Sequence, residues 1–97
     1  MTITQNKSGK TLEVLLEGRL DTLTAPELEK ALSSLEGVEH LVLDLEKVDY
    51  VSSAGLRVML AAHKRMSLQG DMCLRGVQPL VREVLDMSGL SSVLTLS

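Results

Sequence analysis

The stretch HLVLDL at His40–Leu45, followed by EKVDYVS at Glu46–Ser52 and SAGLRVML from Ser53, decides the fold. Its first six residues are almost continuously apolar, which is typical of a strand buried inside a parallel sheet. We expect a loop over Glu46–Ser52 and an amphipathic helix from Ser53 that is ended by Gly70. A buried strand followed by a helix is half of a β-α-β unit, so this stretch predicts an α/β fold.

The residues before this stretch predict a hairpin. The segment Thr2–Lys7 has a propensity for β structure, and apolar and acidic residues alternate from Leu12 to Glu17. The two segments flank the turn residues Ser8–Lys10, which is the arrangement of two antiparallel strands joined by a tight turn.

A first helix is predicted after Gly18-Arg19-Leu20-Asp21, where the alternation breaks. Thr24 and Glu27 have the spacing of a capping box, and a proline is tolerated in the first turn. Apolar residues recur with the helical period and end before Gly37, at positions Leu28, Ala31, Leu32 and Leu35.

The rest of the chain repeats the pattern of strand and helix. We expect a short strand at Met72–Leu74, a helix opened by Pro79 and capped by Gly89, and a final strand at Val93–Leu96. The order β-β-α-β-α-β-α-β implies right-handed crossovers and a mixed, mostly parallel sheet with an N-terminal hairpin and packed helices. With 97 residues, there is room for a single domain, 1–97.

The composition excludes several classes of function. Tyr50 is the one aromatic residue, so the chain lacks the aromatic side chains on which nucleobases stack. The net charge is -3, which disfavours binding to a phosphate backbone, and we expect no nucleic acid partner. No apolar run approaches the ~18 residues that span a bilayer, and Met1–Lys10 does not resemble a signal peptide. Direct membrane insertion is therefore not expected. The single cysteine excludes a disulfide framework, and a cytoplasmic location is the simplest interpretation.

Two motifs resemble parts of enzyme sites. Ser8-Gly9-Lys10-Thr11 lacks the first glycine of a phosphate-binding loop and precedes a strand rather than a helix, so we interpret it as a hairpin turn. Ser53-Ala54-Gly55 matches half of a nucleophile elbow. However, His63 lies about 15 Å along the same helix, and His40 lies at the other end of the strand. No catalytic residue is expected.

A carboxylate cluster of Asp21, Asp44 and Asp49 is the remaining candidate for acid–base chemistry or a Mg²⁺ site. The favoured interpretation is structural, with Asp21 and Asp49 capping turns and Asp44 bonding a neighbouring loop. Neither a metal nor a cofactor is expected.

The segment Asp49–Arg57 is unusual for a connection that is merely structural. Gly55 at the helix start costs roughly 1 kcal/mol relative to alanine, which indicates that something approaches the backbone closely there. Taken alone, the segment favours Ser53 as a plain N-cap over Ser53 as a functional residue.

The whole chain resembles the STAS domain family and, within it, the bacterial anti-sigma factor antagonists. The resemblance covers essentially all 97 residues. It is carried by four segments in order: Gly18-Arg19-Leu20-Asp21, Leu41–Leu45 with Asp44, Val51-Ser52-Ser53-Ala54-Gly55-Leu56, and Asp86-Met87-Ser88-Gly89-Leu90.

The resemblance implies a protein without catalytic activity. Such a protein binds an anti-sigma factor with serine kinase activity and frees the sigma factor; phosphorylation ends the binding and a serine phosphatase reverses it. The family phosphoserine maps onto Ser53, with Ser52 as second choice, and Asp44 would support the site. The implied partner-binding residues are Asp21, Thr22, Ser52, Ser53, Ala54, Gly55 and Arg57.

This chain departs from the sporulation and stress antagonists at three positions. Ser52 and Ala54 stand where those proteins carry aspartate and serine or threonine, and Arg57 stands where glycine is frequent. Two alternatives therefore stay open: a STAS subunit of a membrane lipid-transport ABC complex, and a partner-switching regulator whose output is not a sigma factor.

Overall fold

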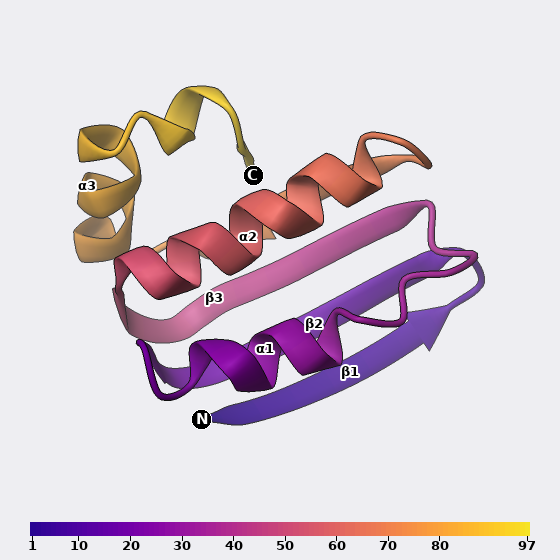
Figure 1. The fold of residues 1–97 in the computed structure, drawn as a ribbon, viewed down its shortest axis with the longest axis horizontal. Helices are drawn as coiled ribbons and strands as arrows, with labels where there is room; N and C mark the ends of the chain where they lie inside the picture. The colour runs from indigo at the N-terminus through magenta and orange to yellow at the C-terminus, as the bar shows by residue number, and fades with distance from the viewer.

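The structure, a computed structural model, describes all 97 residues. The chain forms five strands, three α-helices and one short 3-10 helix in the expected order β-β-α-β-α-β-α-β. Figure 1 shows how the elements are arranged. The elements are β1 (Thr2–Ser8), β2 (Thr11–Leu20), α1 (Ala25–Ala31), β3 (His40–Val51), α2 (Ser53–Met66), β4 (Asp71–Arg75), α3 (Pro79–Met87), η1 (Leu90–Ser92) and β5 (Thr95–Leu96).

The five strands form one mixed sheet in the order β1-β2-β3-β4-β5. β1 and β2 are antiparallel and the other neighbours are parallel, which confirms the predicted α/β fold with its N-terminal hairpin. Ser8 pairs with Thr11 across a two-residue turn, where Gly9 has a φ of 61°. Tight hairpin turns need a positive φ, so the segment resembling a phosphate-binding loop is a hairpin turn.

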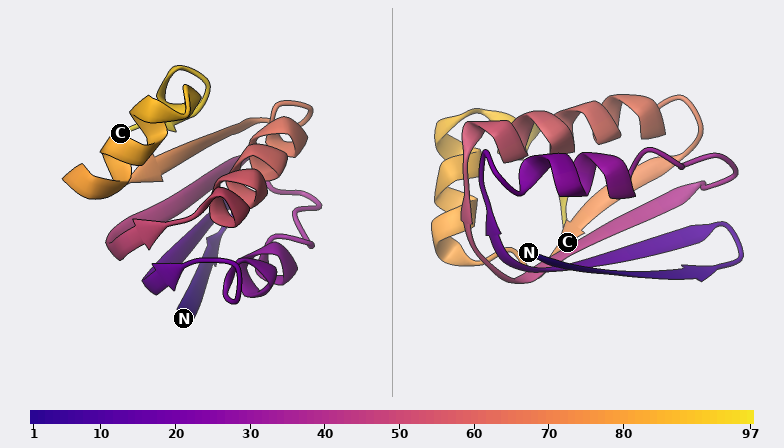
Figure 2. Two further views of the ribbon diagram at one scale, coloured as in Figure 1. Left: turned by 60° about the vertical axis from the view of Figure 1, so that its left-hand side comes forward. Right: turned by 60° about the horizontal axis from the view of Figure 1, so that its bottom comes forward.

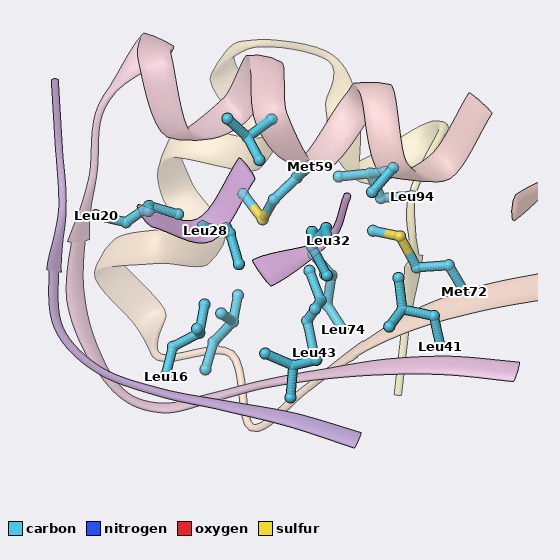
Figure 3. Packing of buried hydrophobic residues seen from close by; sticks show 14 of the residues in the cluster. Leu16, Leu20, Leu28, Leu32, Leu41, Leu43, Met59, Met72, Leu74 and Leu94 are labelled. Atoms are coloured by element: carbon cyan, nitrogen blue, oxygen red, sulfur yellow. The ribbon is translucent and has the colours of Figure 1, made fainter. Parts of the chain in front are cut away.

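The core lies between the sheet and the helices. Figure 2 shows α1 and α2 covering the same face of the sheet, with α3 at the end of the molecule near the start of α2. A cluster of 23 buried hydrophobic residues fills the space between these layers. In Figure 3, Leu16 and Leu43 of the sheet point towards Leu28 of α1 and Met59 of α2. No helix is both long and apolar enough to cross a bilayer.

The prediction of a loop over Glu46–Ser52 is wrong, because β3 continues to Val51. Two register shifts in the β2–β3 ladder, between Leu15 and Glu17 and between Gly18 and Arg19, each place one extra residue in β3. Such bulges bend a strand and interrupt its alternation, which explains why this half of β3 resembles a loop in sequence. Figure 2 shows β3 curving towards α2 at this end.

Two other boundaries differ from the predictions. α1 ends at Ala31 instead of continuing towards Gly37, although Leu35 beyond it is still buried. The last strand is confined to Thr95–Leu96, because the chain first forms the 3-10 turn η1 after Gly89. Gly89 itself has a φ of 78°, the left-handed conformation expected of a residue that ends α3.

Candidate functional site

The end of β2 and the start of α2 are joined by strand pairing. Leu20 and Val51 are neighbours in the parallel β2–β3 ladder. Ser52, which follows Val51, donates its backbone N–H to the carbonyl oxygen of Leu20 at 2.8 Å. Asp21, which follows Leu20, and Ser53, which follows Ser52, therefore leave the sheet at the same end. We call the surface formed by Asp21, Thr22, Ser52, Ser53, Ala54 and Arg57 the Ser53 edge.

The two serines of this edge have opposite environments. Ser52 is the N-cap of α2, and its carbonyl oxygen accepts the backbone N–H of Leu56 at 3.0 Å. Its side-chain Oγ is buried and has no hydrogen-bond partner. Ser53 is the first residue of the helix and is exposed. The N-cap position expected for Ser53 therefore belongs to Ser52, and the hydroxyl open to another protein is that of Ser53.

Gly55 lies beneath this surface. A Cβ atom on Gly55 would be 2.6 Å from Cγ of Leu20 and 3.1 Å from Cγ1 of Val51. The close approach expected from the sequence therefore comes from the buried ends of β2 and β3. Gly55 is itself buried, so the structure places it under the Ser53 edge, where it lets α2 start close to the sheet.

Asp21 closes the loop that follows β2. Its Oδ1 accepts the backbone N–H of Leu23 at 2.9 Å and that of Thr24 at 3.1 Å, which is the turn-capping role predicted for it. These bonds, the one from Thr24 first, hold the pKa of the Asp21 carboxyl below its usual value. Oδ2 faces Nε of Arg19 at 3.9 Å. Asp21 is thus ionised at neutral pH and held in a fixed position beside Ser53's helix.

The predicted capping box of Thr24 and Glu27 is wrong. Thr24 occupies the N-cap position of α1 but makes no side-chain cap hydrogen bond. Its hydroxyl accepts the N–H of Asp21 at 2.9 Å and donates to the carbonyl oxygen of Arg19 at 2.6 Å. The Thr24 side chain therefore bonds to the end of β2 and not to the first turn of α1.

A shallow groove of about 280 Å³ separates the first turns of α1 and α2. It brings together Thr22, Ala54 and Arg57, three of the residues implied by the resemblance, with Pro26 and Glu29 of α1. Nε of Arg57 donates to the carbonyl oxygen of Ser53 at 3.4 Å, so the guanidinium lies back along the first turn of α2. The exposed Ser53 precedes Ala54, which lines this groove.

Asp44 lies within β3, where it pairs with Arg75 of β4. Its Oδ2 accepts hydrogen bonds from Nε and Nη2 of Arg75 at 3.1 and 2.9 Å, and Arg75 also bonds Glu13 at 2.7 Å. Its Oδ1 accepts the backbone N–H of Glu46 at 2.9 Å, and this bond is the main reason that the pKa of Asp44 is lowered. Asp44 thus fixes the start of the bulged part of β3, and its support of the Ser53 edge stays a prediction.

The candidate carboxylate cluster does not form. No three residues among His, Cys, Asp and Glu lie together in a way that could hold a metal ion, so Asp21, Asp44 and Asp49 are separate groups. His40 begins β3 and Ser53 follows its end, as expected for residues at opposite ends of a strand.

A stacked pair of side chains beside the Ser53 edge is not predicted from the sequence. The guanidinium of Arg19 lies 4.2 Å from the centre of the Tyr50 ring, a cation–π contact between β2 and β3. The sequence also gives no sign that Leu23, in the loop after Asp21, is 85% exposed. The parallel register that pairs Arg19 with Tyr50 follows the second bulge, so spacing in the sequence alone does not reveal the pair.

Comparison with known proteins identifies relatives of the whole chain. The family model described as the STAS domain matches residues 2–97. BtrV of Bordetella bronchiseptica, provisionally named an anti-sigma factor antagonist, is 38% identical over 96% of this chain and 83% of its own. The anti-sigma-B factor antagonist of Listeria monocytogenes is 30% identical over 86% of this chain and 75% of its own.

Solved structures share the fold. An anti-sigma factor antagonist from Mycobacterium paratuberculosis superimposes with a TM-score of 0.88 at 25% identity, covering 98% of this chain and 83% of that one. SpoIIAA in its unphosphorylated form gives 0.84 at 20% identity, over 99% and 88% of the two chains. The phosphorylated form of SpoIIAA from Bacillus gives 0.76 at 19% identity, over 99% and 91%.

Proposed function

Because this chain belongs to the STAS domain family, we propose that it is an anti-sigma factor antagonist controlled by phosphorylation of Ser53. Unmodified, it binds an anti-sigma factor that also has serine kinase activity, and a sigma factor is released. Phosphorylation of Ser53 by that partner ends the binding, and a serine phosphatase restores it. The observation that carries the proposal is the contrast between the exposed Ser53 and the buried Oγ of Ser52 at the start of α2.

The helix start favours a phosphate at this position. The N–H groups of the first turn of α2 have no helical partner, and the positive end of the helix dipole lies there. The first turn contains no acidic residue. A phosphate on Ser53 adds about 1.5 to 2 negative charges and three acceptor oxygens. The fold therefore accepts the modification without unfolding.

The phosphate is expected to lower the affinity of the partner for the Ser53 edge. The Ser53 edge already carries the ionised Asp21, and Glu29 lies on the groove between α1 and α2. A partner surface that accommodates a neutral serine beside these carboxylates meets a dianion after phosphorylation. Like charges brought together across an interface cost several kcal/mol, and about 2.7 kcal/mol changes the affinity roughly a hundredfold.

The proposed partners are proteins alone. Anti-sigma factor antagonists are regulatory proteins and not enzymes, so neither a catalytic residue nor a cofactor enters the proposal. The proposed location of this cycle is the cytoplasm. A partner-switching pathway with another output would use the same Ser53 edge, and identification of the bound kinase separates the two.

The test is phosphorylation by the anti-sigma kinase with ATP, followed by intact mass spectrometry. The parent chain is expected to gain one phosphate, Ser53→Ala none, and Ser52→Ala one, because only the hydroxyl of Ser53 is exposed. Phosphorylation of Ser53→Ala together with its loss in Ser52→Ala would move the site to Ser52. If neither the parent chain nor Ser52→Ala gains a phosphate, the result contradicts the proposed cycle.

A further inference from the structure

We propose that β1 is a self-association edge. Two copies of this chain pair their β1 strands antiparallel about a two-fold axis at Gln5 and so join two five-stranded sheets into one. The inference concerns a surface that the proposed phosphorylation cycle does not use, because β1 lies two strands away from β3, which leads to Ser53.

The two edges of the sheet differ in their protection. β5, at one edge, has two residues. β1, at the other edge, has seven, and it pairs with β2 without a register shift. Proteins guard edge strands against pairing by making them short, by bulges, by proline and by charge. β1 has one charged residue, Lys7, and none of the other protections. Figure 1 shows β1 running along the open side of the sheet.

The hairpin register determines which backbone groups of β1 are free. In a two-residue hairpin the closing pair, here Ser8 and Thr11, exchanges both hydrogen bonds, and bonded pairs alternate from there. The backbone groups of Ile3, Gln5 and Lys7 therefore point away from β2. No hydrogen bond outside the strand ladders involves them. Three N–H and three C=O groups thus line the outer edge without a partner.

The helix-facing side of the edge also has room for another strand. A groove of about 580 Å³ lies between the β1 end of the sheet and α1. Its walls are formed by Met1, Ile3, Gln5, Glu27, Lys30 and Ala31. α1 therefore leaves the side chains of this edge partly uncovered, and the alternate side chains of an added strand can enter the groove.

The sequence of β1 is complementary to itself. A two-fold axis at Gln5 places Ile3 opposite Lys7 of the second copy and Gln5 opposite Gln5, so all the free backbone groups find partners. The one charge, Lys7, then faces an apolar residue instead of a like charge, and it lies towards the groove that carries Glu27. This self-complementarity identifies the occupant as a second copy of the chain.

The dimer is expected to be weak and reversible. Pairing of two seven-residue strands falls in the small class of interfaces, below about 1,200 Å². Sedimentation velocity from micromolar to millimolar concentration is expected to show a rising dimer fraction. Amide hydrogen exchange by NMR gives the residue-level readout. The amides of Ile3, Gln5 and Lys7 gain protection as concentration rises, whereas those of Thr4 and Asn6 are protected throughout.

Charge variants test the axis. Gln5→Lys puts two like charges opposite each other and is expected to weaken the dimer at least about tenfold. The matched control is Thr4→Lys, which adds the same charge one residue away, opposite Asn6 of the second copy, and leaves dimerisation nearly unchanged. Mixing Gln5→Lys with Gln5→Glu is expected to restore dimers, because opposite charges then meet at the axis.

Three results would overturn the proposal. A chain that stays monomeric at millimolar concentration would overturn it. This holds also if β1 is found to bind an extended segment of another protein while the chain itself stays monomeric. A dimer in which the amides of Ile3, Gln5 and Lys7 remain unprotected would use another surface. Equal dimerisation of Gln5→Lys and Thr4→Lys would place the axis elsewhere.

Discussion

At the residue scale, Leu20 connects the core to the Ser53 edge. Its carbonyl oxygen accepts the N–H of Ser52, its side chain fills the space left by the missing Cβ of Gly55, and Asp21 follows it in sequence. The fully buried Leu20 side chain therefore determines how closely the start of α2 approaches the sheet. Because the same residue precedes Asp21, the position of the acidic side chain and that of the helix start are determined together.

Substitution of Gly55 by alanine tests this arrangement. The added methyl would lie 2.6 Å from Cγ of the buried Leu20, so core atoms must move. Overpacking costs about 1–3 kcal/mol, partly offset by roughly 1 kcal/mol from better helix propensity. We expect Gly55→Ala to lower the free energy of unfolding by up to about 2 kcal/mol in urea titrations, and the melting temperature by up to roughly 10 °C.

A double-mutant cycle provides the control for this expectation. In a Leu20→Ala background the obstructing Cγ is absent, so Gly55→Ala is expected to become neutral or stabilising. Equal losses in both backgrounds would show that the effect of Gly55 comes from the backbone and not from its contact with Leu20.

At the scale of elements, β3 shows what the sequence predicts and what it does not. The buried half, His40–Leu45, has a strong apolar pattern and was predicted as a strand. The second half contains Val48 and Val51, which are buried three residues apart instead of two or four. The second of the two bulges lies between Val48 and Val51 and causes this spacing, and bulges depend on the pairing with β2, a long-range property that one segment does not reveal.

The same reasoning applies to the candidate site. Ser53, Asp21 and the helix start were placed from local motifs and from the family resemblance, and the parallel pairing of β2 with β3 brings them to one edge. The burial of Ser52's hydroxyl, the role of Leu20 against Gly55 and the reversed bonding of Thr24 depend on contacts between distant segments. Tertiary contacts such as these override local propensities and have no local signal.

The bulged half of β3 is stabilised by Asp44, and this contribution depends on pH. The pKa of Asp44 is lowered in the folded state, first by the bond from the N–H of Glu46 and then by Arg75. Its stabilisation is therefore complete above the unfolded value of about 3.9 and is lost as pH falls through the lower folded value. We expect Asp44→Asn to cost about 1 to 2 kcal/mol at pH 7, with the difference from the parent shrinking towards zero in acid.

Urea titrations of the parent and variant from pH 7 to acid measure this difference. The control is Asp49→Asn, which alters an exposed carboxylate with no hydrogen bond or ion pair and should stay within about 0.5 kcal/mol at every pH. A pH-independent loss in Asp44→Asn would mean that the amide packs badly and that the charge of Asp44 is not responsible.

At the scale of the whole molecule, the fold separates the residue proposed for phosphorylation from the core. Ser53 is exposed at the start of α2, while Gly55, Val58 and Met59 further along the same helix are buried against the sheet. A charge at Ser53 therefore does not touch the residues that hold the helix in place. A phosphate on Ser53 would therefore change the surface while the free energy of unfolding stays nearly constant, as the proposed cycle requires.

Ser53→Asp tests this separation. Aspartate at the first helical residue interacts favourably with the helix dipole, so the melting temperature is expected to change little, within the range of about 0.5 kcal/mol usual for surface substitutions. Binding to the anti-sigma kinase, measured by titration calorimetry, is expected to fall by a hundredfold or more, because the new charge adds to that of Asp21 on a surface where the parent presents a neutral serine. The matched control is Ser53→Asn, which has the same shape without the charge and is expected to bind nearly as the parent does. Loss of binding in both variants would make shape and not charge the cause. Full binding of both would place the interface away from the start of α2, and phosphorylation of Ser53 would then have no direct means of releasing the partner.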